Sequence, residues 1–256
     1  MRGIMKESPR KGSFTTYRVV MAALLFFTVS LGAYAFSFSP MTVSIDPSGA
    51  GAVMTYRVTN ESDQQTAVAI KLMTRSIDIE GKESNQPADK LFLVFPSRVV
   101  LKPNSSQNVK VQYRGPANLA SEQAYRVFAE QLPVDFTKST SSGVSILLTY
   151  VAALYVSPKN VTPKLQVASV VGAEKEGQRG LLVTLRNLGT KHALIANPIV
   201  RIRQGGSATT AEFTGDMVGG IDGQNVLALS ERRFFMAWDL AVIGTTYEGT
   251  FDAEID

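Results

Sequence analysis

The chain has 256 residues, of which 45% are hydrophobic and 19% charged, so it can bury the core of one large or two ordinary domains. It contains no cysteine and one histidine, His192, which excludes thiolate metal sites and cysteine nucleophiles and most zinc sites and catalytic triads. No G-x-S-x-G or P-loop motif is present. We therefore expect no cofactor, no metal and no enzymatic activity.

Residues 1–35 have the pattern of a secretory signal peptide. A basic segment precedes an apolar run at 19–31, and Ala33-Tyr34-Ala35 is an A-x-A cleavage site. The alternative is an uncleaved anchor helix, for which the apolar run is short. Cleavage after Ala35 would start the mature chain at Phe36 and remove five Lys/Arg and one Glu, so the formal charge would fall from +4 to zero. The mature chain would then have no basic field for nucleic acid and no stable membrane insertion.

Strand patterns recur through residues 36–133, separated by turn residues. Residues 53–58, 68–73, 109–114 and 125–130 alternate apolar and polar, and 91–95 and 99–101 are short apolar runs. Residues 81–89 are predicted to form a polar loop. This half of the chain shows no sustained helical period, which is typical of an antiparallel sandwich of about seven strands.

The longest apolar stretch, residues 143–156 (GVSILLTYVAALYV), has no charge and no proline and is predicted to be one long strand. A loose segment at 138–143 precedes it, and Pro158 follows it. Such a strand is either central in a core or an edge that pairs with a partner. We interpret it as the partner-binding strand.

A second group of strands follows a stiff linker at 157–163. Their ranges are 164–171, 181–186, 193–202, 226–229, 233–238 and 246–255, with Pro198 marking an edge or a bulge. The sequence thus predicts an all-β protein of two immunoglobulin-like sandwiches in tandem, with a signal peptide at 1–35, an N-terminal domain at 36–157 and a C-terminal domain at 158–256.

The order of these segments resembles the PapD-like periplasmic chaperones of pilus assembly, which belong to the chaperone–usher pathway. The segments that carry the resemblance are 92–96 (FLVFP), 100–103 (VLKP), 107–111 (QNVKV), 122–133 (EQAYRVFAEQLP), 154–158 (LYVSP) and 182–188 (LVTLRNL). The Gly115-Pro116 turn and the Tyr125-Arg126 pair are more similar to its alternative or archaic branches.

The resemblance implies a periplasmic chaperone that binds pilin subunits by donor-strand complementation and delivers them to an outer-membrane usher. In that mechanism the long strand fills the apolar groove of a pilin that lacks its own last strand. The implied donor side chains are Val144, Ile146, Leu148 and Tyr150. The alternative is that these residues face the protein's own core, since the opposite face is also apolar.

The sequence departs from the family at the site that anchors a pilin's C-terminal carboxylate. Classical members carry an arginine on the first strand and a lysine on the seventh, whereas here the lysine position falls near Ala153 and the first strand offers Met41, Thr42 and Ser44. We predict that Arg126 performs this anchoring, because arginine can give a carboxylate two parallel hydrogen bonds. The alternative is an ordinary solvated arginine, paired with Glu130.

The competing function is a secreted carbohydrate-binding or adhesive β-sandwich, which would need aromatic side chains gathered on an exposed face. The only tryptophan, Trp238, is predicted to belong to the second core instead. His192 is predicted to be a turn or surface residue. The acidic segment with Asp78, Glu80 and Glu83 lacks the spacing of an EF-type calcium loop.

Overall fold

The computed structural model describes residues 36–133, 146–203, 210–218 and 220–255, all of which lie in one compact unit, residues 35–256. The predicted signal peptide with its cleavage site, the segment 138–143 and Val144 lie outside the described residues. The described elements are strands apart from two 3-10 turns, η1 (Ala50–Ala52) and η2 (Gly215–Val218). The all-β prediction is confirmed.

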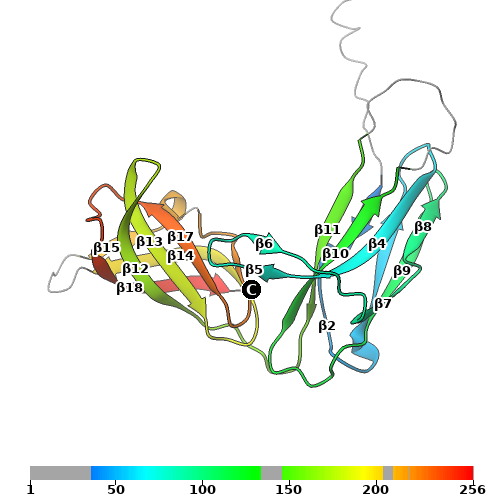
Figure 1. Ribbon diagram of the computed structural model, residues 1–256, viewed down its shortest axis with the longest axis horizontal. Coiled ribbons are helices and arrows are strands. Elements are labelled where there is room, and N and C mark those ends of the chain that lie inside the picture. Colours follow the sequence, from blue (N-terminus) through cyan, green and yellow to red (C-terminus); the bar gives the residue numbers. More distant parts are fainter. Residues whose placement is uncertain (1–35, 134–145, 204–209, 219, 256) are drawn as a thin grey trace, which may run out of the picture. The chain divides into compact units, whose positions relative to one another are not determined.

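The first half of the chain forms two main sheets that enclose one core (Figure 1). The four-stranded sheet has the order β1 (Ser37–Ser39), β3 (Val53–Thr59), β9 (Ser106–Tyr113) and β7 (Phe92–Phe95). The five-stranded sheet has the order β2 (Thr42–Ile45), β11 (Thr149–Val156), β10 (Gln123–Gln131), β4 (Thr66–Thr74) and β8 (Arg98–Leu101). A small hairpin of β5 (Ser76–Ile77) and β6 (Glu83–Ser84) extends from the end of β4.

Alternation along each strand places the apolar side chains in this core. Tyr56 and Val58 of β3 are fully buried beside Val109 and Val111 of β9, while the residues between them are more exposed. The five-stranded sheet contributes Ala152, Leu154 and Val156 of β11 to the same core. This is the packing of a β-sandwich, in which two inner faces interdigitate.

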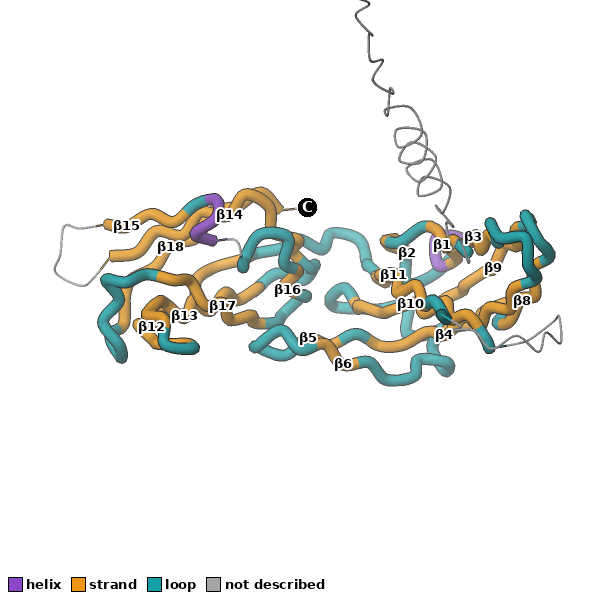
Figure 2. Tube along the Cα trace, turned by 90° about the horizontal axis from the view of Figure 1, so that it is seen from above, coloured by secondary structure: helices purple, strands orange, loops and turns teal. Residues whose placement is uncertain are grey.

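The second half forms a further set of seven strands around a separate core (Figure 2). Its order is β15 (Thr210–Phe213), β14 (Ala193–Arg203), β18 (Thr246–Ile255), β12 (Leu165–Lys175), β13 (Gln178–Asn187) and β17 (Glu231–Ala237), with β16 (Asn225–Val226) paired to β14. Only two residue pairs join β12 to β18, so the sheet can fold into two layers there. Trp238 packs on this core between Phe213 and Tyr247, as predicted.

Most predicted strands are present, and the predicted irregularity at Pro198 is confirmed by a register shift between Ala196 and Ile199. Three predictions are wrong. The strand predicted at 226–229 is confined to β16, Asn225–Val226, and a turn follows at 228–229. The polar loop at 81–89 contains β6, because Gly81 in the left-handed region at φ 90° lets the chain return onto β5. The long strand is also shorter than predicted, since β11 begins at Thr149 and residues 146–148 are irregular. The predicted domain boundary at 157–158 stays a prediction.

Candidate functional site

Half of β11 has a free backbone edge. Strand β10 pairs with the whole of β11, but β2 pairs in parallel only with Ala153–Val156. The Leu148 carbonyl accepts a hydrogen bond from the Gln131 N–H, whereas the Ala153 N–H donates to the Met41 carbonyl on the opposite side. Because backbone groups alternate in direction, Thr149 and Val151 also turn theirs away from β10. Within the described residues, no strand lies beside them there.

Apolar side chains are exposed along the same segment. Ile146 is 71% exposed, Leu147 46% and Val151 37%. An unpaired edge with exposed apolar side chains is an aggregation hazard unless something covers it. This segment, residues 146–152, is the candidate binding edge.

The four predicted donor residues have different surroundings. Ile146 is exposed, and Val144 lies outside the described residues. Leu148 and Tyr150 pack against the first core, because a period of two places them on the same side as Leu154. The Tyr150 hydroxyl donates to the Phe36 carbonyl at 2.7 Å, and the two rings meet edge to face with centroids 4.9 Å apart. The Tyr150 side chain therefore makes its contacts within the protein itself, as the own-core alternative predicted.

Arg126 lies beside Ala153, the position near which the family resemblance places an anchoring lysine that this chain lacks. Its Cα partners Ala153 on β11, and Ala153 in turn partners Thr42 on β2. Directly paired residues present their side chains on one face of a sheet, so these three positions form one row. Arg126 projects from the outer face of this sheet, because Tyr125 and Val127 on either side of it are buried in the core.

The Arg126 guanidinium is held by Glu83 of the β5–β6 hairpin. Its Nε donates to Glu83 Oε1 at 2.8 Å and its Nη2 to Oε2 at 2.6 Å. The alternative pairing with Glu130 is wrong, because Glu130 is bound by Lys71 from the neighbouring strand β4. Sequence reasoning missed Glu83 as a site residue. The one signal was a hairpin pattern around Gly81 in a segment interpreted as a loop.

A second arginine binds the same carboxylate. Arg75 Nε donates to Glu83 Oε2 at 2.9 Å, and Arg75 Nη1 donates to the Tyr155 hydroxyl at 3.0 Å. Burial raises the pKa of the Glu83 carboxyl, but hydrogen bonds from Arg126 and Arg75 lower it by more, and the pKa falls from 4.5 to about 2. Glu83 is thus an ionised carboxylate shared by two guanidinium groups.

Residues 38–162 match the family described as "Pili and flagellar-assembly chaperone, PapD N-terminal domain". Residues 38–162 therefore form a PapD-like chaperone domain. No match was found among curated protein sequences. The matched family is one of assembly chaperones, a non-catalytic class of protein.

Solved structures of fimbrial chaperones share the fold of almost the whole chain. The class 5 fimbriae chaperone CfaA superposes with a TM-score of 0.54 at 14% identity, covering 86% of this chain and 99% of CfaA. A complex of the chaperone CsuC with the tip subunit CsuE, from archaic Csu pili of Acinetobacter baumannii, gives a TM-score of 0.57 at 18% identity and covers 87% and 97%. A chaperone–tip adhesin complex of CFA/I fimbriae gives 0.54 at 15%, covering 83% and 97%.

His192 lies in the bend before β14, in line with the prediction of a turn or surface residue, but its side chain is only 13% exposed. Its ring is stacked on Tyr155 at a centroid distance of 3.9 Å. Its backbone N–H donates to Glu122 at 3.0 Å, and its Nδ1 contacts the same oxygen. Glu122 also accepts from the Ser157 hydroxyl. The only histidine therefore helps to join the two halves of the chain.

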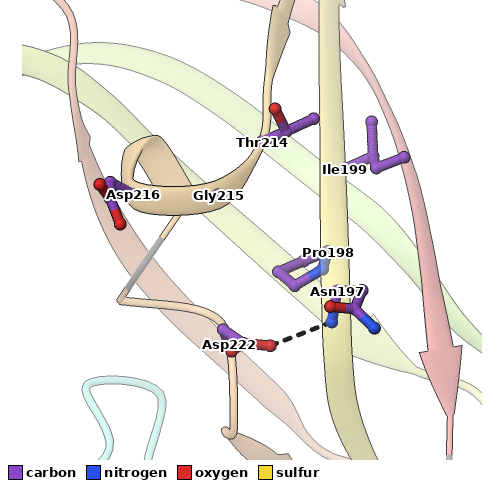
Figure 3. Close-up of a pocket in the computed structure, with 7 residues that line it drawn as sticks. All are labelled: Asn197, Pro198, Ile199, Thr214, Gly215, Asp216 and Asp222. Carbon is purple, nitrogen blue, oxygen red and sulfur yellow. Dashed lines mark hydrogen bonds between the residues drawn. The ribbon is translucent and has the colours of Figure 1, made fainter.

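A hollow lies beside the β14 bulge (Figure 3). It has a volume of about 490 Å³ and is lined by Asn197, Pro198, Ile199, Thr214, Gly215, Asp216 and Asp222. The Asp222 carboxylate already accepts a hydrogen bond from the Asn197 N–H at 3.0 Å. No aromatic side chain is among these lining residues, so the hollow lacks a platform for stacking a sugar ring.

The acidic residues of the segment at 78–83 bind groups of the protein itself. Glu80 pairs with Arg233 at 2.9 Å, and Asp78 accepts from the Lys82 N–H at 2.8 Å. Among the described residues there is no group of three metal-ligating side chains, and no helix there is long and apolar enough to span a membrane.

Proposed function

We propose that this PapD-like chaperone captures pilin subunits by donor-strand complementation, using the binding edge at 146–152 and the segment before it. The observation that carries the proposal is the half-paired strand β11, with its free Thr149 and Val151 backbone groups and its exposed Ile146. A subunit that lacks a strand needs both a backbone partner and apolar side chains. This edge offers both.

The backbone and the side chains would play separate parts. Main-chain hydrogen bonds to the free edge give affinity that does not depend on the subunit's sequence, while alternate side chains fill its pockets. We assign the pocket-filling role to Val144 and Ile146, with Leu148 at the boundary to the protein's own core. Tyr150 then closes the chaperone's core at the point where the subunit's groove begins.

We further assign Arg126 to the C-terminal carboxylate of the subunit. Its place in the row with Ala153 and Thr42 supports this, because a cation there would fix the register of a strand pairing beside β11. A slip of one residue would turn every donor side chain to the wrong face. A charge-assisted contact at one end prevents that slip.

The same proposal places the mature protein in the periplasm, after cleavage of residues 1–35, with an outer-membrane usher as its second partner. The family description and the solved chaperone–subunit complexes support the assembly role. The predicted signal peptide supports export.

The test is capture of a co-expressed pilin by Ile146→Asp. Because Ile146 is exposed, the variant should fold as the wild type does, and a carboxylate in an apolar groove should weaken capture by about tenfold or more. Val100→Asp is the matched control, since Val100 is 57% exposed on β8, the other edge strand of the same sheet. Leu148→Asp should also lower stability, because Leu148 packs on the core.

Co-purification of the pilin is measured beside circular dichroism of each variant. Loss of pilin with Ile146→Asp and retention with Val100→Asp is the expected result. Equal capture by the wild type and Ile146→Asp would contradict the proposal.

A further inference from the structure

The Arg126–Glu83 pair has the geometry of a bound carboxylate ligand. Two adjacent guanidinium nitrogens of Arg126 meet the two oxygens of one carboxylate, at 2.8 and 2.6 Å. This parallel arrangement is the strongest that arginine makes with a carboxylate, and a peptide's C-terminal carboxylate would adopt it equally well. Glu83 therefore occupies the position in which an anchored chain terminus would lie.

The charges around this pair leave room for a second carboxylate. Arg75 and Arg126 bring two positive charges to the single negative charge of Glu83. The Arg75 side chain is only 8% exposed, while Arg126 and Glu83 are 19% and 25% exposed and can be reached from solvent. Burial lowers the Arg232 pKa, the nearby Asp78 charge raises it and the Arg75 charge lowers it, so Arg232 adds a positive and Asp78 a negative charge to a cluster whose net charge stays positive. The cluster favours an incoming anion.

Glu83 sits on an element that can shift at small cost. The ladder of the β5–β6 hairpin has two residue pairs, Ser76 with Ser84 and Ile77 with Glu83, and the Asp78 N–H donates to the Lys82 carbonyl to close the turn. This ladder is shorter than those of the two main sheets, so less free energy is needed to shift the hairpin. Its tip is fixed separately, by the Arg233 N–H that donates to the Ile79 carbonyl at 2.7 Å. The Glu83 side chain can thus move while the tip stays attached.

We propose that Glu83 is a built-in occupant of a carboxylate-binding site formed by Arg126 and Arg75, and that a peptide's C-terminal carboxylate takes Arg126 from it by exchange. This inference rests on the proposed function, which supplies the subunit that carries the terminus. In the free chaperone Glu83 keeps the Arg126 guanidinium paired and oriented. In the complex the terminus takes both hydrogen bonds of Arg126.

The exchange leaves no charge unpaired. Glu83 Oε2 is already shared between Arg126 Nη2 and Arg75 Nε, so Glu83 retains Arg75 when Arg126 changes partner. Two guanidinium groups then face two carboxylates. An unpaired charge at a partly buried site is costly, and the complex offsets the one positive charge that is in excess in the free chaperone.

The test needs no pilin, so its failure and that of the proposed function are distinguishable. The probe is N-acetylglycine, a minimal peptide terminus, titrated at constant ionic strength while the Arg126 Nε–H signal is followed by NMR. Glu83→Gln should lower the half-saturating concentration about tenfold, because the competing charge is removed. Glu130→Gln is the matched control and should behave as the wild type, since Glu130 binds Lys71 instead.

Three results would overturn the proposal. Equal half-saturation in Glu83→Gln and the wild type would show that Glu83 does not compete. Equal binding of N-acetylglycinamide would show that the carboxylate is not recognised. Equal binding of N-acetylaspartic acid α-amide, whose only carboxylate is on the side chain, would show that the site does not select a chain terminus. If Glu83→Gln fails to fold, the wild-type protein alone provides the test. Its Arg126 Nε–H signal should shift at the highest soluble concentration of N-acetylglycine, while the signal of Arg57, which donates to Ser106, should not. An unchanged Arg126 signal would contradict the proposal.

Discussion

The hydroxyl of Tyr56 is buried and has no hydrogen-bond partner among the described residues. Its ring is stacked on Phe38 in the first core, and burial raises the pKa of the phenol. An unpaired buried hydroxyl costs its full desolvation energy, so removing it relieves that cost. Tyr56→Phe should therefore raise the free energy of unfolding by about 1 kcal/mol.

Tyr150→Phe is the natural comparison, because the Tyr150 hydroxyl is paired with the Phe36 carbonyl at 2.7 Å. Losing that bond should lower the free energy of unfolding by about 1 kcal/mol. Urea unfolding of both variants measures the difference. Equal losses in the two variants would mean that Tyr56 has a partner after all.

At the scale of elements, strong alternation predicted the strands well. Residues 246–255 were predicted as they occur, and β3, β4 and β10 differ from their predicted ranges by one or two residues at either end. In β3, β10 and β18 the core-facing positions alternate with more exposed ones, so the period and the burial agree, whereas β4 is buried on both faces over Thr66–Ile70.

The wrong predictions concern features that depend on contacts between residues far apart in the chain. The apolar run at 143–156 predicted one strand, but a run of apolar residues cannot tell where pairing stops, and β2 reaches only Ala153–Val156. The two-residue strands β5 and β6 are too short to show a period. Glu83, the partner of Arg126, lies 43 residues away in the chain, so this pair could be identified only from the folded structure.

At the scale of the whole unit, Glu122 and His192 tie segments that belong to the two cores. The Glu122 side chain is 1% exposed, and its carboxylate accepts hydrogen bonds from His192 and Ser157. Burial raises the pKa of Glu122, but these hydrogen bonds, that of His192 above all, outweigh burial and lower it below its ordinary value. Glu122 is therefore ionised in the folded protein at neutral pH.

This predicts a specific loss of stability in acid. Because the pKa of Glu122 is lower in the folded than in the unfolded state, the unfolded chain takes up the proton first as the pH falls below the ordinary range of a glutamate, near 4.5. The contribution is complete above that pH and is lost as the pH falls toward the folded pKa. Glu122→Gln should cost about 2 kcal/mol at pH 7 and reduce this acid dependence, as measured by urea unfolding at several pH values. An unchanged acid dependence in the variant would contradict it.

The most direct test of donor-strand pairing is hydrogen exchange at the free half of β11. Amide exchange of Thr149 and Val151 is measured in the free chaperone and in its complex with a pilin, with Ala153 as the internal reference, since its N–H already donates to Met41. If a subunit strand pairs with this edge, exchange at Thr149 and Val151 should slow by at least about tenfold while Ala153 changes little. Unchanged exchange at both amides in a saturated complex would contradict the central claim.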